Sequence, residues 1–392
     1  MSPLAPSVLV GFANALAAPE VVASLLSRGY RVASFSRRGQ GVALRRMHGV
    51  ELVEVTAPED DLSACLREVA TAAEAYDAIM PLDDPAVLVC DRGLPVDAPV
   101  AGPRGARARF ALDKREQLRG AGEAGFQVPP WVQLQPEADL PDGWELPAMV
   151  KPALAVEELN GRLRRLSPHL VTTPAELHRL RGAWGASTPI VLQRWLPGRG
   201  AGIFGLAEHG DVHHLSAHRR VRMMNPAGSG SSACVSAPVP EALRDPVSRL
   251  MKAVDWTGMF MVELLESGGT WWFMEVNGRP WGSLALARRL RFEYPAWAVA
   301  RLLDEHAPLP DAPAFAELEC RHLGRELVHL LFVLRGPGSY AGRWPGRRET
   351  LRAFSKGARS AGWYNLAPGM HGVFLDDVWR TVADQTYRRR RS

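Results

Sequence analysis

The stretch that decides the fold is residues 259–283, MFMVELLESGGTWWFMEVNGRPWGS. Its two halves, 259–266 and 270–277, are rich in β-branched and aromatic residues, and the Ser-Gly-Gly between them is a turn sequence. We therefore expect a β-hairpin with a three-residue loop. Three polar residues interrupt the apolar strands, and they would be costly to bury unless a positive charge met them: Glu263, Glu275 and Asn277.

The spacing of these polar residues predicts a metal site. Glu275 and Asn277 share one face of their strand, and with a three-residue loop Glu263 lies diagonally beside Glu275, roughly 5 to 8 Å away. Magnesium prefers oxygen ligands from one or two carboxylates, water and phosphates. Arg279 follows on the same face, where its guanidinium could neutralise charge on a transferring phosphoryl group. The alternative is that two edge-strand carboxylates and a surface arginine face water.

The pattern E-x-N-x-R after an acidic strand resembles the metal-binding hairpin of the ATP-grasp superfamily, in particular its carbamoyl-phosphate-synthase-like and biotin-carboxylase-like ligases. The resemblance covers about residues 7–305 and implies ATP and Mg²⁺ as cofactors. It implies that Glu263, Glu275 and Asn277 bind the metal. It also implies that Arg279 is a catalytic residue.

Further matches follow in the expected order. Lys114 in FALDK and Lys151 in AMVKP resemble the two lysines that contact the nucleotide phosphates, and they are two of only four lysines in the chain. The resemblance also implies that a hinge between two subdomains binds the adenine, formed here by Gln193, Arg194, Trp195 and Leu196.

Two departures from the family pattern are visible. Arg194 stands where an acidic residue is usual, so the sequence does not show what contacts the ribose. The Gly-rich flap expected in 153–165 retains only Gly161. Three arginines in this region either supply positive charge instead or cover a solvated face: Arg162, Arg164 and Arg165.

The first hundred residues alternate apolar strands with helices, which predicts a small parallel sheet covered by helices. We expect strands at 7–11, 30–36, 50–55 and 78–82, and helices at 18–28 and 62–76. The first loop lacks the G-x-G-x-x-G pattern, so a nicotinamide dinucleotide is poorly supported. Asp83 and Asp84 follow the last strand, where such sheets bind ligands; they either hold a substrate amine or cap a helix. The basic strand at 217–222 adds Arg219 and Arg220 as candidate substrate residues.

These segments predict an α/β protein in three parts. An N-terminal parallel α/β domain spans 1–105, and an ATP-grasp core of two α+β subdomains that clamp ATP spans 106–307, with a lid at about 130–194. A small C-terminal appendage spans 308–392, and the sequence does not show its role.

The composition argues against several classes of protein. The 392 residues, 46% of them hydrophobic, are enough for two or three packed domains. We find no run of about 18 uncharged apolar residues and no signal peptide, so we expect a cytoplasmic protein without membrane partners. The four cysteines are far apart, which disfavours disulfides and zinc. The net charge of +5 is modest, and the terminal arginines 388–391 are more typical of a solvated end than of a nucleic-acid site.

The resemblance implies an ATP-dependent carboxylate–amine ligase that forms an acylphosphate, transfers the acyl group to an amine and releases ADP and phosphate. We expect small-molecule carboxylate and amine substrates and a role in small-molecule or natural-product biosynthesis, and a homodimer remains open. The alternatives are a non-catalytic ATP sensor, an ATP-grasp enzyme with a non-amine nucleophile, and a nucleic-acid-binding protein suggested by the sequence pI of about 9.2.

Overall fold

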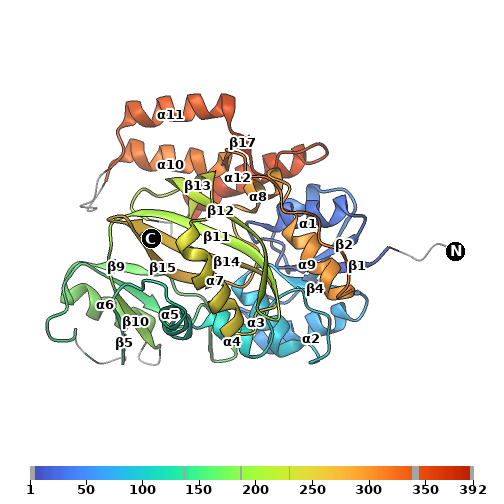
Figure 1. Cartoon of the computed structure of the whole chain (residues 1–392), viewed down its shortest axis with the longest axis horizontal. Coiled ribbons are helices and arrows are strands. Elements are labelled where there is room, and N and C mark those ends of the chain that lie inside the picture. Colours follow the sequence, from blue (N-terminus) through green and yellow to red (C-terminus); the bar gives the residue numbers. More distant parts are fainter. Residues whose placement is uncertain are drawn as a thin grey trace.

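A computed structural model describes residues 5–388 except 136, 137, 139, 186, 187, 229 and 338–343. Three sheets and a short two-stranded hairpin organise the described chain. Figure 1 shows the N-terminal sheet at one end of the molecule, the second sheet at the other, and the largest sheet between them. Arginines 389–391 of the basic tail lie outside the described residues. No helix in the described part is long and apolar enough to cross a membrane.

The N-terminal sheet confirms the predicted parallel arrangement, with strand order β3-β2-β1-β4. Apolar strands buried on both faces favour a sheet of this kind. Its strands are β1 (Ser7–Gly11), β2 (Arg31–Arg37), β3 (Val50–Val55) and β4 (Ala78–Pro81), and its helical elements are α1 (Ala18–Ser27), η1 (Ala43–Arg46), α2 (Leu62–Ala73) and α3 (Asp84–Gly93).

Two short helices, α4 (Ala106–Leu112) and α5 (Lys114–Glu123), lead into the second, antiparallel sheet, which has the order β5-β10-β6-β9. This sheet lies in the region predicted as the lid. A hairpin beside it docks on the N-terminal domain through backbone bonds from Leu62 to Gly161 and from Leu163 to Pro58. The elements of this region are β5 (Trp131–Leu134), β6 (Ala148–Pro152), the hairpin strands β7 (Glu157–Leu159) and β8 (Arg162–Arg164), β9 (His169–Val171), α6 (Pro174–Trp184) and β10 (Ile190–Arg194).

The largest sheet has seven strands in the order β15-β14-β11-β12-β13-β16-β17. One face carries Phe204 and Met261 and packs toward the N-terminal domain and α9, and the other carries Val262 and packs on α5 and α7. Its members and helices are β11 (Arg199–Glu208), β12 (Asp211–Met223), β13 (Ser231–Ala237), α7 (Glu241–Ala253), β14 (Gly258–Ser267), β15 (Thr270–Asn277), α8 (Leu284–Arg289), α9 (Tyr294–Leu303), β16 (Glu319–Arg321) and β17 (Gly362–Trp363).

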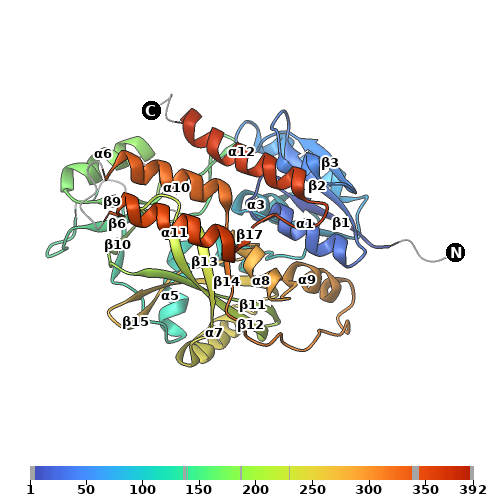
Figure 2. The ribbon, with the colours of Figure 1, turned by 90° about the horizontal axis from the view of Figure 1, so that it is seen from above.

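The C-terminal segment is built into this sheet, whereas the sequence suggested an appendage. Its strand β16 pairs with β13, and β17 extends the edge. The same segment also contains three helices: α10 (Leu323–Arg335), α11 (Arg347–Ser360) and α12 (His371–Arg388). Figure 2 shows α12 lying along the N-terminal domain, and the backbone N–H of Asn365 donates to Glu20 there at 2.8 Å. The segment therefore joins the central sheet to the N-terminal domain.

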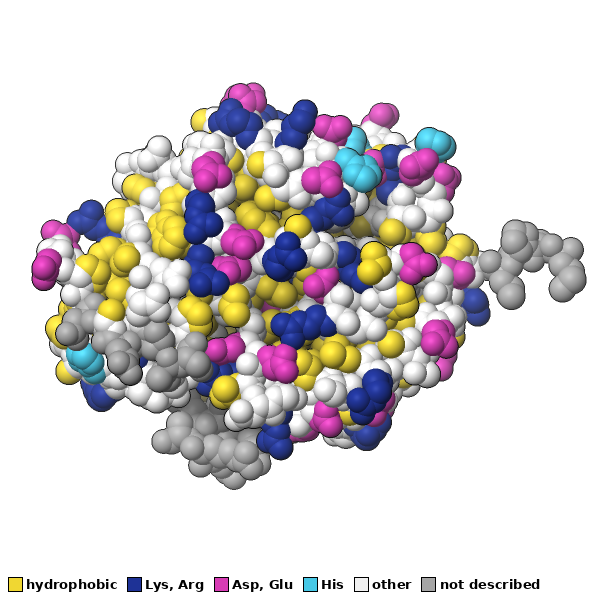
Figure 3. All heavy atoms as spheres, turned by 90° about the horizontal axis from the view of Figure 1, so that it is seen from below, with side chains coloured by type: hydrophobic (Ala, Val, Ile, Leu, Met, Phe, Trp, Pro, Cys, Tyr) yellow, Lys and Arg dark blue, Asp and Glu magenta, His cyan; other side chains and the backbone are white. Residues whose placement is uncertain are grey.

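Acidic and basic side chains are interspersed on the face shown in Figure 3. Binding to nucleic acid depends on lysines and arginines that neutralise several phosphates together. Among the described residues on this face, no extended basic patch of that kind is visible.

Candidate active site

The hairpin formed by β14 and β15 brings Glu263 directly opposite Glu275. The sequence predicted a diagonal arrangement across a three-residue loop, and that detail is wrong. The turn contains only Gly268 and Gly269, because Ser267 pairs with Thr270. A two-residue turn alone would place Met274 opposite Glu263, but a bulge shifts the register there and brings Glu275 into that position.

Glu275 is held among positive charges. Burial by itself raises the pKa of this carboxyl, but Lys114 and Lys151 more than offset that effect and hold its pKa below the ordinary value. Asn277 is buried beside it, and its Nδ2 donates to Glu275 Oε1 at 3.4 Å. The structure therefore brings the predicted metal residues together on the sheet face that looks toward the N-terminal domain.

The two predicted phosphate lysines reach this face from different elements. Lys114 is the first residue of α5, and Lys151 lies in β6 of the second sheet. Lys151 is buried, and its Nζ donates to Gln193 Oε1 at 2.7 Å. Burial lowers the pKa of Lys151, and Lys114 adds to that shift while Glu275 opposes it. The Nε2 of Gln193 is fully buried with no partner among the described residues, so the site has an unused donor next to the lysine.

Arg279 is positioned by Asp84. Its Nε donates to Asp84 Oδ1 at 2.9 Å, and Arg165 from the segment after β8 donates to Asp84 Oδ2 at 2.8 Å. Of the three flap arginines, Arg165 thus reaches the site, while Arg164 pairs with Glu157. Both oxygens of Asp84 are occupied, so its carboxylate orients Arg279 and ties the segment after the β7–β8 hairpin to the N-terminal domain.

Asp83 caps a helix in this structure. Its Oδ1 accepts a bond from the backbone N–H of Ala86 at 2.9 Å, so it caps α3, which is the alternative that its position allowed. Burial raises the pKa of Asp83 to about 6. Both aspartates are thus engaged by other groups of the chain, and their predicted substrate role stays a prediction.

Arg219 and Arg220 point to opposite faces of β12, as successive residues of a strand must. Arg219 is exposed to solvent. Arg220 lies on the same sheet face as Glu263, and its Nη2 is 2.8 Å from Glu263 Oε1. Gly200 makes this contact feasible, because a Cβ at that position would lie 2.6 Å from Arg220 Cδ. Within the Gly-rich stretch, Gly200 therefore leaves room for the Arg220 side chain across β11.

The predicted hinge connects β10 to β11. Trp195 and Leu196 are half-buried in this connection, whereas the Arg194 side chain is exposed and pairs with Glu145. The backbone N–H of Arg194 donates to the Pro130 carbonyl at 2.8 Å, so its side chain and its N–H are both engaged within the protein. The structure does not add a ribose contact.

Sequence reasoning missed Gln117. This buried residue of α5 accepts a bond from the Val276 N–H at 2.9 Å and donates to the Val276 carbonyl at 2.9 Å. Its side-chain amide thus forms the pair of hydrogen bonds that a neighbouring strand would form with β15, and it fixes the backbone between Glu275 and Asn277. Its spacing of three from Lys114 was an available signal, because residues three apart share a helix face.

The donor set fits magnesium better than a transition metal. Within the described residues, no three His, Cys, Asp or Glu side chains gather as a metal cluster. Two opposed glutamates and an amide oxygen suit a hard cation whose other ligands are phosphate oxygens and water.

A separate cavity of about 530 Å³ lies between β12, α7 and the 312–315 segment. None of the predicted site residues lines it. Its walls are mainly apolar, and it has no opposed carboxylates, so it does not compete with the hairpin as the site of chemistry.

No family model matches the sequence, and no curated protein is significantly similar to it. Solved structures do match its fold. An L-amino acid ligase from Bacillus licheniformis aligns over 77% of this chain and 75% of its own with a TM-score of 0.58 and 18% identity. An N5-carboxyaminoimidazole synthetase from Staphylococcus aureus aligns over 91% and 97% with a TM-score of 0.61 and 12% identity. A biotin carboxylase from Campylobacter jejuni, solved as its βγ-ATP complex, aligns over 78% and 72% with a TM-score of 0.58 and 15% identity.

The chain has the ATP-grasp fold. The second sheet and strands β11 to β15 of the seven-stranded sheet lie in the region predicted as the two subdomains of the core. The predicted site residues of both subdomains face each other across the junction, with Asp84 of the N-terminal domain as a third contributor.

Proposed function

We propose that this protein is an ATP-dependent carboxylate–amine ligase. The observation that carries the proposal is the opposed pair of Glu263 and Glu275, surrounded by Lys114, Lys151 and Arg279 from three other segments. Such convergence of carboxylates and cations suits a nucleotide triphosphate with its metal. The similarity in fold to an L-amino acid ligase supports an amine as the nucleophile.

The residues present fit Mg·ATP. Lys151 and the unpartnered Gln193 Nε2 would contact the nucleotide from the second sheet, and Lys114 would contact its phosphates from the start of α5. Glu263, Glu275 and the Asn277 amide oxygen would hold Mg²⁺, which neutralises phosphate charge when bound. The Glu263 carboxylate would then be shared between the metal and Arg220.

Catalysis in this proposal is positioning and charge stabilisation. A substrate carboxylate oxygen attacks the γ-phosphorus, ADP leaves, and the amine nitrogen then displaces phosphate from the acylphosphate. Arg279 would stabilise the charge on the transferring group, since Asp84 fixes its Nε side and its Nη2 has no partner in the described chain. Contacts between the β7–β8 hairpin and the N-terminal domain would keep water from the acylphosphate.

A screen of paired carboxylates and amines, with ADP release as the readout, tests the proposal. Hydroxylamine in place of the amine would trap an acylphosphate as a hydroxamate and so identify the activated carboxylate separately. We expect ADP, phosphate and an amide in equal amounts for at least one pair.

Glu275→Gln provides the inactive control for that screen. Nucleotide binding without ADP release in any pair, or in the presence of hydroxylamine, would favour a sensor over a ligase. Hydroxamate formation without amide formation would point to a nucleophile other than an amine.

A further inference from the structure

Arg325, in the first turn of α10, is a cation without an acidic partner. Its Nη1 donates to the Ser231 carbonyl at 2.9 Å, and no carboxylate of the described residues lies within ion-pairing distance of it. The side chain is half-buried, so it retains some contact with solvent. A positive charge in the first turn also opposes the helix dipole, which favours anions at that end. Its position is therefore unfavourable unless an anion joins it.

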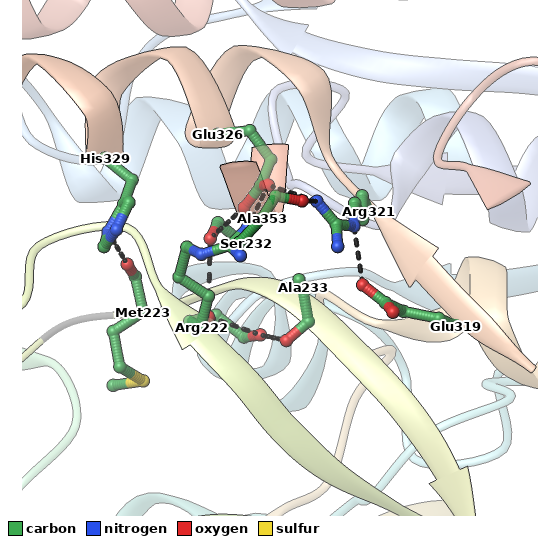
Figure 4. Close-up of polar contacts among 10 residues, drawn as sticks. Arg222, Met223, Ser232, Ala233, Glu319, Arg321, Glu326, His329 and Ala353 are labelled. Carbon is green, nitrogen blue, oxygen red and sulfur yellow. Dashed lines mark hydrogen bonds and ion pairs between the residues drawn. The ribbon is translucent and has the colours of Figure 1, made fainter. Parts of the chain in front are cut away.

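The nearest acids are already engaged by other groups. Glu326 is fully buried and accepts from Arg222, from Ser232 at 2.6 Å and from Arg321 at 3.1 Å (Figure 4). A carboxylate with three such donors has little capacity left for a fourth. Glu326 therefore balances the charges of Arg222 and Arg321. It does not balance the charge of Arg325.

The other nearby acid is Asp377 of α12. It lies 3.1 Å from His322 Nε2 and accepts from Asn365 Nδ2 at 3.0 Å. The ion pairs of the described residues do not join it to Arg325, although its charge raises the pKa of Arg325. Both of these acids, Glu326 and Asp377, are therefore bound by side chains other than Arg325.

Arg325 is linked to the catalytic face through Arg220. The Nη1 of Arg325 donates to the Ser231 carbonyl, the Ser231 hydroxyl lies 2.9 Å from Cys234 Sγ, and Cys234 pairs in register with Arg220 between β13 and β12. Burial lowers the pKa of Arg325, and the charge of Arg220 acts in the same direction. Arg220 in turn contacts Glu263, one of the proposed metal ligands, at 2.8 Å. The C-terminal segment therefore places a second guanidinium near the one that contacts a proposed metal ligand.

We propose that Arg325, together with Arg220, binds a carboxylate of the substrate that the reaction leaves unchanged. This inference rests on the proposed ligase function and makes one substrate either an amino acid acceptor or a dicarboxylic acid donor. In both cases the shared chemistry is a free carboxylate, which matches the planar fork of a guanidinium. The C-terminal segment then contributes to substrate binding.

Calorimetric titration of succinate into the full chain tests the anion site without any turnover. Arg325→Met removes the charge, and Arg335→Met, at the exposed far end of the same helix, is the matched control. We expect Arg325→Met to weaken succinate binding about tenfold or more, the usual effect of losing a charge-assisted contact, and Arg335→Met to leave it unchanged. Absence of succinate binding to the unaltered protein, or equal binding to both variants, would overturn the proposal.

Steady-state kinetics then identify the source of the carboxylate. If it belongs to the acceptor, Arg325→Met raises the KM for amino acids but not for amino acid amides. If it belongs to the donor, the variant raises the KM for a dicarboxylate but not for its monoamide. An active ligase whose KM values do not change in Arg325→Met overturns the proposal, whereas an inactive protein that binds succinate only through Arg325 overturns the ligase function alone.

Melting curves on each variant guard against a folding defect. If Arg325→Met does not fold, Arg325→Lys keeps the charge and the reach toward Ser231 but not the planar fork. That variant should fold and bind succinate severalfold more weakly. Unchanged succinate affinity in folded Arg325→Lys overturns the proposal.

Discussion

Glu263 lies directly opposite Glu275 because β15 contains one extra residue, Met274, relative to β14. Side chains alternate between the two faces of a strand, so without this bulge Glu275 would point to the face that packs on α5 and α7. There it would be buried among apolar groups at a large cost. The two carboxylates therefore share a face because of a local irregularity in the strand.

Glu275→Gln tests the metal site. The amide keeps the shape of the side chain but removes its charge, so turnover should fall by about two orders of magnitude or more while the far-UV circular dichroism stays unchanged. Glu266→Gln, on the same hairpin but the other face, is the control and should keep near-normal activity. Full activity in Glu275→Gln would refute the assignment.

The lysine assignments lead to a second prediction. Lys114→Met and Lys151→Met should each weaken ATP binding or turnover by about 1.5 to 3 kcal/mol, or roughly 10- to 150-fold, because each loses a charge-assisted contact. The exposed Lys252→Met is the reference. Titration with ATP and steady-state kinetics measure both quantities, and equal effects at all three positions would show that the sites were assigned wrongly.

Gly200→Ala should destabilise the protein through Arg220. The new methyl group would lie 2.6 Å from Arg220 Cδ and force the arginine away from Glu263, at a cost of about 1 to 3 kcal/mol in the free energy of unfolding. In an Arg220→Ala background the same change should cost little, which urea unfolding of the double mutant can measure. Additive effects of Gly200→Ala and Arg220→Ala would contradict the proposed clash.

The control is Gly182→Ala in α6. The new methyl group meets nothing within 4 Å, so this change should instead stabilise the protein by about 0.5 to 1 kcal/mol.

Arg279→Lys separates a catalytic role from a structural one. Lysine cannot both replace the Nε contact with Asp84 and present a second donor to a phosphoryl group, so kcat should fall by about 100- to 1,000-fold with little change in the KM for ATP. Arg288→Lys, which disturbs the pairing with Glu20 and Glu293, should lower the melting temperature and leave kcat per folded molecule unchanged. The same pattern in Arg279→Lys would assign Arg279 to the scaffold.

His218 makes stability depend on pH. Burial lowers the pKa of His218 from about 6.5 to about 3, so its imidazole stays neutral in the folded protein over this range. Its contribution to the free energy of unfolding is therefore complete above pH 6.5. As the pH falls from 6.5 toward 3, the unfolded chain gains a proton that the folded chain does not, and this contribution is lost. Urea unfolding at pH 8 and pH 5 should show a smaller loss for His218→Gln than for the unaltered protein. The exposed His306→Gln should show the same loss as the unaltered protein, and no difference between the two variants would refute the assignment.

The sequence by itself determined the local elements. Apolar and helical patterns located the four N-terminal strands and the helices α1 and α2, and the polar interruptions of an apolar hairpin identified Glu263, Glu275 and Asn277. These signals are readable because they depend on backbone geometry and on neighbours a few residues apart.

Only the tertiary structure decided which side chains meet. The bulge at Met274, the pairing of Asp84 with Arg279 and Arg165, and the insertion of β16 into the main sheet depend on packing between segments far apart in the chain. Local sequence carries no record of such pairings, because a strand or an arginine can satisfy its hydrogen bonds with many partners and the global fold selects one. For this reason the polar residues of the hairpin could be singled out as a candidate metal site from the sequence, whereas the proposed contribution of Arg325 could not.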